Sequence, residues 1–397
     1  MREFHRINRL PPYTLGIVNE LKHQARCRGE DIIDFGLGNP DQTTPKHIVD
    51  KLCEAATKAG NHRYSLSRGI YKLRLAITDW YKRRFDVDLD PETEAIATIG
   101  SKEGIAHLAL AITAPGDSVL VPTPTYPIHT YAFILANGDV IHVPMGKDVD
   151  FFEALLDTFK RNWPRPKAII INFPHNPTTH VVEIDFFEKI VEFAKEHDLI
   201  VIHDFAYADM VFDGYKAPSF LQVPGAKDVG VEFHSLSKTF NMTGWRIAFI
   251  VGNELVVKGL AHVKDNIDSG QFAAIQKAGI HALENPDITQ KILEKYRRRL
   301  TLLVDALNSV GFDAAMSGGS FFLYVEAPKG IRGGQRFETG EDFSQFLIKE
   351  MLISTVPWDD VGRFTRFSAT FTAKDPKEET RIVAEIKKRL SSVEFEF

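Results

Sequence analysis

The stretch Ser-Leu-Ser-Lys-Thr-Phe-Asn-Met-Thr-Gly-Trp-Arg, residues 235–246, follows the apolar run Gly230–His234. A short apolar run that ends in a hydroxyl-rich turn is typical of a buried strand in an α/β sheet. Within this turn, the amine of Lys238 can form a Schiff base with an aldehyde cofactor. The hydroxyls of Ser235 and Ser237 and the guanidinium of Arg246 suit a phosphate. Taken alone, the stretch could also be a polar strand-to-helix turn without chemistry.

The rest of the middle of the chain repeats this strand-then-helix pattern. Apolar residues recur at helical spacing in Glu183–His197 and in Lys102–Thr113, and the second of these follows a plausible turn at Gly100-Ser101. The alternation predicts an α/β fold with a large, doubly wound and mostly parallel sheet. Besides Gly230–His234, the predicted strands are Ser118–Val121, Ala168–Asn172, Leu199–His203 and Ile247–Val251.

The pattern changes after about residue 285, where a long charged helix is expected over Asp287–Val310. Two β-rich segments and a final helix follow it, which predicts a smaller α+β domain. We therefore expect a large domain at 46–285 and a small domain that combines 1–45, including an N-terminal arm, with 286–397. The remaining predicted elements are strands in Ser320–Glu326 and Phe364–Thr370, a helix at Glu378–Leu390 and a mobile surface loop at Lys329–Gly340.

Composition excludes several classes of protein. The net charge of −5 and the pI near 6.3 argue against nucleic-acid binding. Arg297-Arg298-Arg299 is expected to be the solvated face of a helix. Cys27 and Cys53 are expected to be small core residues of a protein in the reducing cytosol, and to form no disulfide or metal site. The start lacks the apolar run of a signal peptide, and no stretch reaches the roughly 18 apolar residues of a membrane span. We expect a cytoplasmic protein.

Two further polar motifs close predicted strands. Asp204 directly follows the predicted strand Leu199–His203, at the end of the strand where open α/β sheets bind ligands. Beneath a pyridine ring, this carboxylate would keep the ring nitrogen protonated, and Tyr207 could donate to a phenolic oxygen. Asn176, in Asn176-Pro177, follows Ala168–Asn172, and its amide could reach a ring oxygen. A strand-end cap for Asp204 and a simple Asn-Pro turn are the alternatives.

Two more motifs complete the set. Ser101 and Lys102 start a predicted helix, where backbone N–H groups favour an anion. Tyr126 follows Ser118–Val121 and could stack on a flat cofactor. In this order, and together with Gly38-Asn-Pro-Asp, Tyr64 and Arg366, the motifs resemble those of the fold-type-I, class I/II aminotransferases over essentially the whole chain.

The resemblance implies pyridoxal 5′-phosphate as cofactor and assigns roles to individual residues. Lys238 would bind the cofactor covalently and transfer the proton, while Asp204 would pair with the ring nitrogen. Tyr126 would stack on the ring, and Asn176 and Tyr207 would contact its hydroxyl group. The other implied contacts are Ser101, Lys102, Ser235, Ser237, Arg246 and, from the other subunit of a homodimer, Tyr64 for the cofactor phosphate, and Arg366, Gly38, Tyr13 and Asn176 for the substrate.

The choice of substrate depends on segments that are more specific than the motifs of the whole class. Segments such as Arg-Leu-Pro-Pro-Tyr13 and Tyr-Pro-Ile-His129 are similar to those of bacterial alanine (glutamate–pyruvate) aminotransferases. No arginine at a recognisable position is dedicated to a distal carboxylate, so alanine with 2-oxoglutarate is the expected pair. An LL-diaminopimelate, aspartate or methionine aminotransferase is the alternative within the class. A β-lyase is the alternative reaction, and a ligand-sensing transcription regulator would need a DNA-binding domain ahead of the fold.

Overall fold

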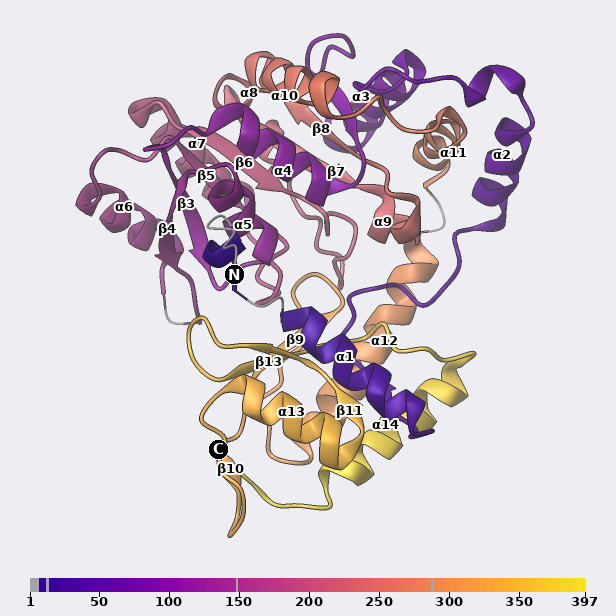
Figure 1. Cartoon of the computed structure of the whole chain (residues 1–397), viewed down its shortest axis with the longest axis vertical. Helices are drawn as coiled ribbons and strands as arrows, with labels where there is room; N and C mark the ends of the chain where they lie inside the picture. The colour runs from indigo at the N-terminus through magenta and orange to yellow at the C-terminus, as the bar shows by residue number, and fades with distance from the viewer. Residues whose placement is uncertain (1–6, 12–13, 148, 287–288) are drawn as a thin grey trace, which may run out of the picture. The chain divides into compact units, whose positions relative to one another are not determined.

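The computed structural model describes residues 7–11, 14–147, 149–286 and 289–397 (Figure 1). The chain divides into two compact units. The large unit comprises Gln42–His175 and Val181–Gln290, and the small unit comprises Met1–Asp41, Asn176–His180 and Lys291–Phe397. The division expected from the sequence did not single out Asn176–His180. This segment belongs to the small unit because Gly319 N donates to Thr179 O at 3.1 Å and Arg366 donates to Asn176.

The large unit is built on a seven-stranded sheet in the order β2-β8-β7-β6-β5-β3-β4. β8 is antiparallel to both of its neighbours, and the remaining pairs are parallel. The α/β fold with a mostly parallel sheet is thus confirmed. The strands are β2 Ala95–Thr98, β3 Ser118–Thr123, β4 Asp139–Pro144, β5 Ala168–Ile171, β6 Ile200–Asp204, β7 Gly230–Ser235 and β8 Ala248–Gly252.

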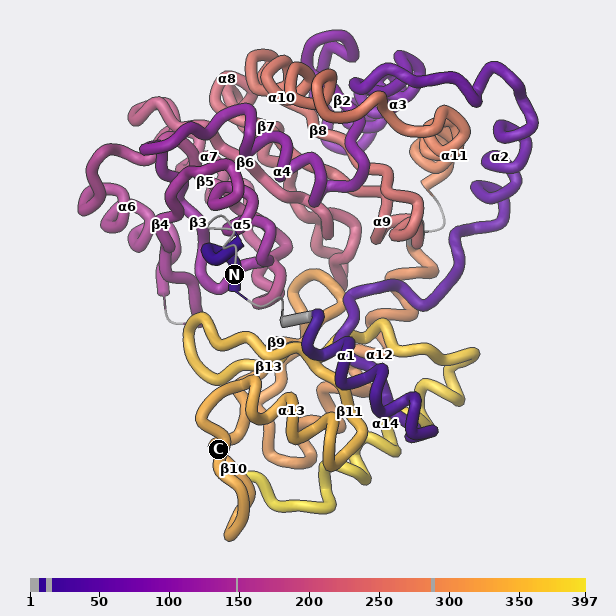
Figure 2. Tube along the Cα trace, viewed as in Figure 1, coloured from indigo at the N-terminus to yellow at the C-terminus, as the bar shows by residue number. Residues whose placement is uncertain are grey.

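Helices cover both faces of this sheet because successive strand residues point to opposite sides. Ile170 of β5 packs in the cluster formed by α4, α5 and α10, whereas Ile169 packs in the cluster that includes α3, α6, α7 and α11. In Figure 2, α2 lies beside α11. The helices of this unit are α2 Lys46–Ala56, α3 Tyr71–Phe85, α4 Ser101–Ile112, α5 Pro127–Leu135, α6 Phe151–Arg161, α7 Ile184–His197, α8 Ala226–Val229, α9 Leu236–Thr239, α10 Glu254–Ile267 and α11 Ala273–Glu284, with 3-10 turns η2 Ala59–His62, η3 Phe220–Gln222 and η4 Thr243–Trp245.

The small unit contains a three-stranded antiparallel sheet in the order β12-β13-β9. Two short pairs accompany it: β1 is parallel to β11, and β10 is antiparallel to β14. The elements are η1 Ile7–Arg9, α1 Thr14–Cys27, β1 Ile33–Asp34, α12 Thr289–Asn308, whose first two residues precede the unit's boundary, β9 Phe322–Glu326, β10 Gly330–Ile331, α13 Gly340–Met351, β11 Ile353–Ser354, β12 Val356–Trp358, β13 Phe364–Ser368, α14 Pro376–Leu390 and β14 Phe395–Glu396.

The expectation of a solvated arginine face on α12 is wrong for Arg299, which is fully buried. Its Nε donates to Glu379 at 2.9 Å, its Nη2 donates to Asp41 at 3.0 Å, and its Nη1 donates to the carbonyl of Phe371 at 2.7 Å. Consecutive helix residues point about 100° apart, so three arginines in a row cannot share one face. Buried carboxylates on α14 and after Pro40 supply the partners.

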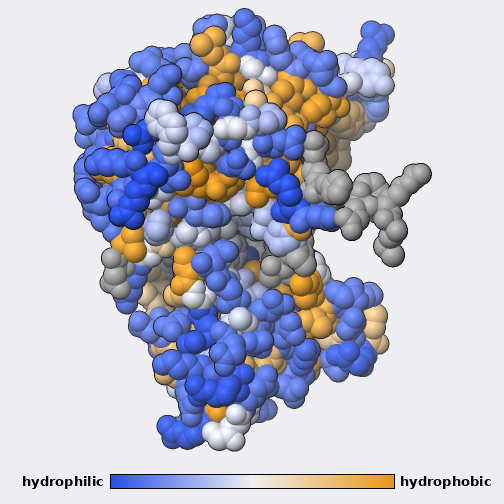
Figure 3. All heavy atoms as spheres, turned by 60° about the vertical axis from the view of Figure 1, so that its left-hand side comes forward, coloured by the Kyte–Doolittle hydropathy of each residue, from blue (hydrophilic) through white to orange (hydrophobic). Residues whose placement is uncertain are grey.

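The expectation for the two cysteines is also wrong. Cys27 and Cys53 are exposed, because Cys27 ends α1 and Cys53 lies away from the buried face of α2. Most of the segment Lys329–Gly340 is exposed, as expected for a surface loop, but it also contains β10 and the buried side chain of Phe337. Figure 3 shows a face on which hydrophilic residues predominate and hydrophobic ones form scattered patches. None of the helices among the described residues combines the length and apolarity needed to cross a bilayer.

Candidate active site

Predicted site residues of the large unit gather at one edge of its sheet. β3, β5, β6 and β7 are parallel, so the segments that follow them begin at the same edge. β2 runs in the same direction, because it and β7 are both antiparallel to β8. This edge therefore receives the segments that begin with Ser101, Tyr126, Asp204 and Ser235.

Lys238 lies in α9, a single helical turn directly after β7. The hydroxyl of Ser235 caps this turn by accepting a 3.2 Å hydrogen bond from Ser237 N. Ser235 and Ser237 are buried, whereas Lys238 is half-buried. Its neighbour Thr239 donates to Asp209 at 2.9 Å, so the turn is anchored on both sides of the lysine.

The turn before α4 and the guanidinium of Arg246 lie against each other. Gly100 has φ +84°, and a Cβ added there would come within 2.0 Å of Arg246 Nη2. Only glycine permits this approach, because any side chain would strike the guanidinium. Ser101 Oγ is buried and has no hydrogen-bond partner among the described residues. The helix N-terminus, this hydroxyl and the arginine form a donor set suited to an anion. Lys102, in the same first turn, is exposed.

Asp204 ends β6 and is buried. Its Oδ2 accepts a 2.9 Å hydrogen bond from Nε2 of His129, while Thr125 Oγ1 lies 2.9 Å from Nδ1 of the same ring. Its Oδ1 is buried without a partner in the described part of the chain. One oxygen is therefore held in place, while the other can still accept a hydrogen bond from a bound group. Among the described residues, no backbone N–H group that follows Asp204 donates to its carboxylate, as a cap of the next segment would require.

Tyr126 packs edge-on against His129, with ring centroids 5.8 Å apart and an interplanar angle of 83°. His129 therefore contacts both Tyr126 and Asp204, which lie on different elements. It was not among the residues predicted from the sequence to form the site. The sequence did hold one signal for His129: it lies three residues after Tyr126, one helical turn further along the chain.

Tyr207 is buried beyond the end of β6, whereas Tyr64 is 92% exposed in the single chain. The segment after Tyr64 is nevertheless anchored. Gln276 donates to Ser65 Oγ at 2.8 Å, and Ser67 Oγ donates to the carbonyl of Asp268 at 3.0 Å. The backbone beside Tyr64 is therefore held in place, while the Tyr64 ring packs little against the rest of the chain.

In the small unit, β13 carries Arg366, which is 4% exposed. Its Nη1 donates to Asn176 Oδ1 at 2.7 Å, and its Nη2 donates to the Gly36 carbonyl at 3.2 Å. The guanidinium lies 3.9 Å from the centroid of the Phe322 ring. A Cβ on Gly38 would come within 2.8 Å of this same ring. The structure therefore brings Arg366, Asn176 and the Gly36–Gly38 backbone together. The predicted substrate residue Tyr13 lies outside the described residues.

These groups fit the phosphate and the ring of pyridoxal phosphate. Ser101 Oγ and the helix N-terminus beside Arg246 suit the phosphate, and the unpartnered Oδ1 of Asp204 suits a protonated ring nitrogen. Lys238 supplies the primary amine that the aldehyde requires. Glu103, His107 and Asp268 also lie close enough together to hold a metal ion.

Known proteins match the chain along most of its length. Residues 30–386 match the family model of aminotransferase class I and II. Glutamate-pyruvate aminotransferase AlaC of Escherichia coli is 49% identical over 364 residues, which cover 91% of this chain and 87% of that protein. LL-diaminopimelate aminotransferase of Methanocaldococcus jannaschii is 44% identical over 399 residues, covering 97% and 94%. The substrate-bound BacF structure from Bacillus subtilis superposes with a TM-score of 0.90 at 31% identity, covering 100% and 99%.

Proposed function

Because the chain belongs to the class I and II aminotransferases, which depend on pyridoxal phosphate, we propose that it transfers the amino group of L-alanine to 2-oxoglutarate. The products are pyruvate and L-glutamate. We propose further that it acts as a homodimer in the cytoplasm. An LL-diaminopimelate aminotransferase is the second candidate, since relatives with that activity are 44% and 45% identical to this chain.

The observation that supports the reaction most directly is the state of Asp204. One oxygen of its carboxylate is held by His129 and the other has no partner in the described chain. A buried carboxylate held in this way would keep a pyridine nitrogen protonated. When bound, pyridoxal phosphate supplies an electron sink that stabilises the negative charge left when the substrate loses its α-proton.

The remaining steps belong to residues of the chain. Lys238 would bind the cofactor and, once its amine is released by the incoming amino acid, would move the proton from the substrate α-carbon. Ser101, Lys102, Ser235 and Arg246 would hold the phosphate. Tyr126 would stack on the ring, and Asn176 and Tyr207 would bind its hydroxyl group. Ser237 belongs to the same proposed cofactor set.

Arg366 would hold the α-carboxylate common to all amino and oxo acids, with help from Gly38 and Asn176. A planar guanidinium can bind a carboxylate through two parallel hydrogen bonds. The contacts of Arg366 with Asn176, Gly36 and Phe322 restrict its orientation. The proposed substrate contact of Tyr13 rests on the sequence resemblance alone.

The dimer is proposed because Tyr64 is exposed on an anchored segment. It would complete the phosphate site of the other subunit. Mixing Tyr64→Ala with Lys238→Ala should then restore part of the activity, because one site of each mixed dimer would have an intact Lys238 and an intact Tyr64. Continued inactivity of folded mixed dimers would assign Tyr64 to its own subunit.

A panel of amino donors tests the substrate assignment. Alanine with 2-oxoglutarate should give one of the highest values of kcat/KM. Initial rates measured while both substrates are varied should follow ping-pong kinetics. Much faster turnover of LL-diaminopimelate would overturn the alanine assignment but leave the reaction type standing. Release of ammonia and pyruvate without amino transfer to an oxo acid would instead indicate a β-lyase.

A further inference from the structure

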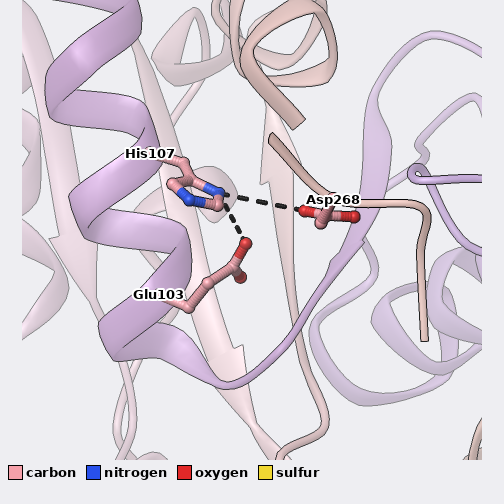
Figure 4. Close-up of side chains that lie close together, drawn as sticks. All are labelled: Glu103, His107 and Asp268. Atoms are coloured by element: carbon pink, nitrogen blue, oxygen red, sulfur yellow. Dashed lines mark ion pairs between the residues drawn. The ribbon is translucent and has the colours of Figure 1, made fainter. Parts of the chain in front are cut away.

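Figure 4 shows Glu103 and His107 of α4 close to Asp268, and α4 begins at Ser101 of the proposed phosphate turn. We use "charge cluster" for Glu103 and His107 of α4 together with Lys264 and Asp268 at the end of α10. Lys264 Nζ donates to Glu103 Oε1 at 2.9 Å and to Asp268 Oδ2 at 2.8 Å. His107 Nδ1 lies 2.6 Å from Glu103 Oε1 and 4.0 Å from Asp268 Oδ2.

The three potential metal ligands of this cluster do not need a metal ion. Lys264 is 1% exposed, and its ammonium already contacts one oxygen of each carboxylate. A divalent cation would have to displace this buried charge or lie beside it, and both arrangements carry a large electrostatic cost. The lysine already places a shared positive charge between the two carboxylates, at the position a metal ion would take.

The second oxygen of each carboxylate holds a backbone N–H group. Glu103 Oε2 accepts from Ile99 N at 2.8 Å, immediately before the Gly100-Ser101 turn. Asp268 Oδ1 accepts from Gly270 N at 2.8 Å. Since Lys264 bridges both carboxylates, it links the turn before α4 to the loop after α10.

The loop Asp268–Gln271 in turn contacts two parts of the proposed phosphate site. Gly270 has φ +80°, and a Cβ there would come within 2.5 Å of the Leu66 carbonyl oxygen. Ser67 also donates to the Asp268 carbonyl, so the loop lies against the segment that follows Tyr64. Gln271 Nε2 donates to the Arg246 carbonyl at 2.5 Å.

We propose that Lys264 is a positioning residue that couples the two phosphate sites of the dimer. Through Glu103 it orients the Ser101-Lys102 turn, which binds the cofactor phosphate of its own subunit. Through Asp268 it orients the segment that carries Tyr64 to the partner's cofactor. The inference rests on the proposed dimer and on the proposed role of Tyr64.

Removal of the ammonium in Lys264→Met leaves two neighbouring carboxylates without their shared cation. Their repulsion should weaken the bonds to Ile99 N and Gly270 N. We expect pyridoxal phosphate to dissociate from the purified holoenzyme about tenfold faster, as expected for loss of one charge-assisted hydrogen bond. Amide hydrogen exchange at Ile99 and Gly270 should also be faster. Lys258→Met, which removes an exposed lysine from the same helix, should change neither measurement.

Mixed dimers test two links separately: the link through Glu103 to the Ser101-Lys102 turn, and the link through Asp268 to the segment that carries Tyr64 (the Tyr64 arm). In a dimer of Tyr64→Ala and Lys238→Ala chains, the intact site takes its Ser101-Lys102 turn from the first chain and its Tyr64 from the second. Lys264→Met is introduced into one chain at a time. We expect either placement to weaken cofactor retention and to raise the concentration of pyridoxal phosphate needed for half-maximal activity.

The outcomes distinguish the proposals. An effect from only one placement, or from neither, would overturn the coupling while leaving the shared site intact. If the mixed dimer without Lys264→Met is inactive, the shared site itself is wrong, and the coupling fails with it. Should Lys264→Met not fold, Ser67→Ala tests the Tyr64 arm alone, because it removes the bond to Asp268 O and spares the charge cluster. Unchanged cofactor retention with Ser67→Ala in the Tyr64-donating chain would then overturn the coupling.

Discussion

The hydroxyl of Thr239 donates a 2.9 Å hydrogen bond to the carboxylate of Asp209. Thr239 is the neighbour of Lys238 in sequence, and Asp209 lies just beyond Tyr207. The same carboxylate accepts a 3.0 Å hydrogen bond from Arg84 of α3. Asp209 therefore ties the turn that carries the proposed catalytic lysine to the segment that follows β6. Neither residue was predicted to belong to the site.

Thr239→Val keeps the shape of the side chain but removes the donor. Because a hydrogen bond to a charged group stabilises by about 1.5–3 kcal/mol, we expect misplacement of Lys238 and a roughly tenfold lower kcat. KM should change much less, since substrate binding does not involve this contact. Steady-state kinetics with Thr239→Ser as the matched control provides the test. Equal kcat for the valine and serine variants would show that the contact is only structural.

Lys238→Ala should leave a folded protein that retains pyridoxal phosphate without a covalent bond. The visible absorbance of the holoenzyme should lose its dependence on pH, because no lysine amine remains to titrate while bound to the cofactor. Transamination should be abolished within the limits of a standard coupled assay. A near wild-type rate would exclude Lys238 as the catalytic residue.

Asp204→Ala should lower kcat at least about a hundredfold, as expected when a principal electrostatic stabiliser is removed. Asp204→Glu keeps the charge but displaces it, so a milder loss is expected. The comparison is made by steady-state kinetics at saturating cofactor. Unchanged turnover of the alanine variant would indicate that Asp204 serves only to organise the end of β6.

Arg366→Lys should raise KM for every amino acid and oxo acid by a similar factor. The ammonium of lysine cannot reproduce two parallel hydrogen bonds to a carboxylate. Cofactor affinity, measured by titration of the apoenzyme, should remain unchanged. An effect confined to one substrate would identify Arg366 as a reader of the substrate side chain.

Glu379→Gln should destabilise the small unit by about 3 kcal/mol or more, because it leaves the buried Arg299 without one of its carboxylate partners. Burial opposes the charge of Glu379, but hydrogen bonds from Arg298 and Arg299 outweigh it and lower its pKa. A lowered carboxyl pKa stabilises the fold above the usual value and loses this effect as the pH falls through the lowered value.

Chemical denaturation at several pH values measures this contribution. The difference in unfolding free energy between wild type and Glu379→Gln should be largest near neutral pH and should shrink below about pH 4, near the usual carboxyl pKa. Glu350→Gln, an exposed control in the same unit, should have little effect. An equal effect of both variants would contradict the role assigned to the Arg299 pair.

β5 and the first part of β6 were identified because strands buried on both faces read as continuous apolar runs. β7 is buried as well, although it includes Glu232 and His234. β4 was not predicted because it is an edge strand with mostly exposed or half-buried side chains, so its sequence is not a continuous apolar run. β2 escaped because its four residues include two alanines, which carry little strand preference.

The order of the motifs along the chain was enough to predict the family, which the family model confirms, because a lysine, a strand-end aspartate and an arginine keep their chemical types wherever they lie. Tertiary structure alone decided which distant residues meet. His129 reaches Asp204, Thr239 reaches Asp209, and Lys264 reaches Glu103 across separations that no local pattern encodes. The same holds for Arg299, whose burial depends on carboxylates from Asp41 and Glu379. The physical reason is that hydrophobic periodicity specifies which face of an element is buried, whereas the partner of a polar group depends on how several elements pack together.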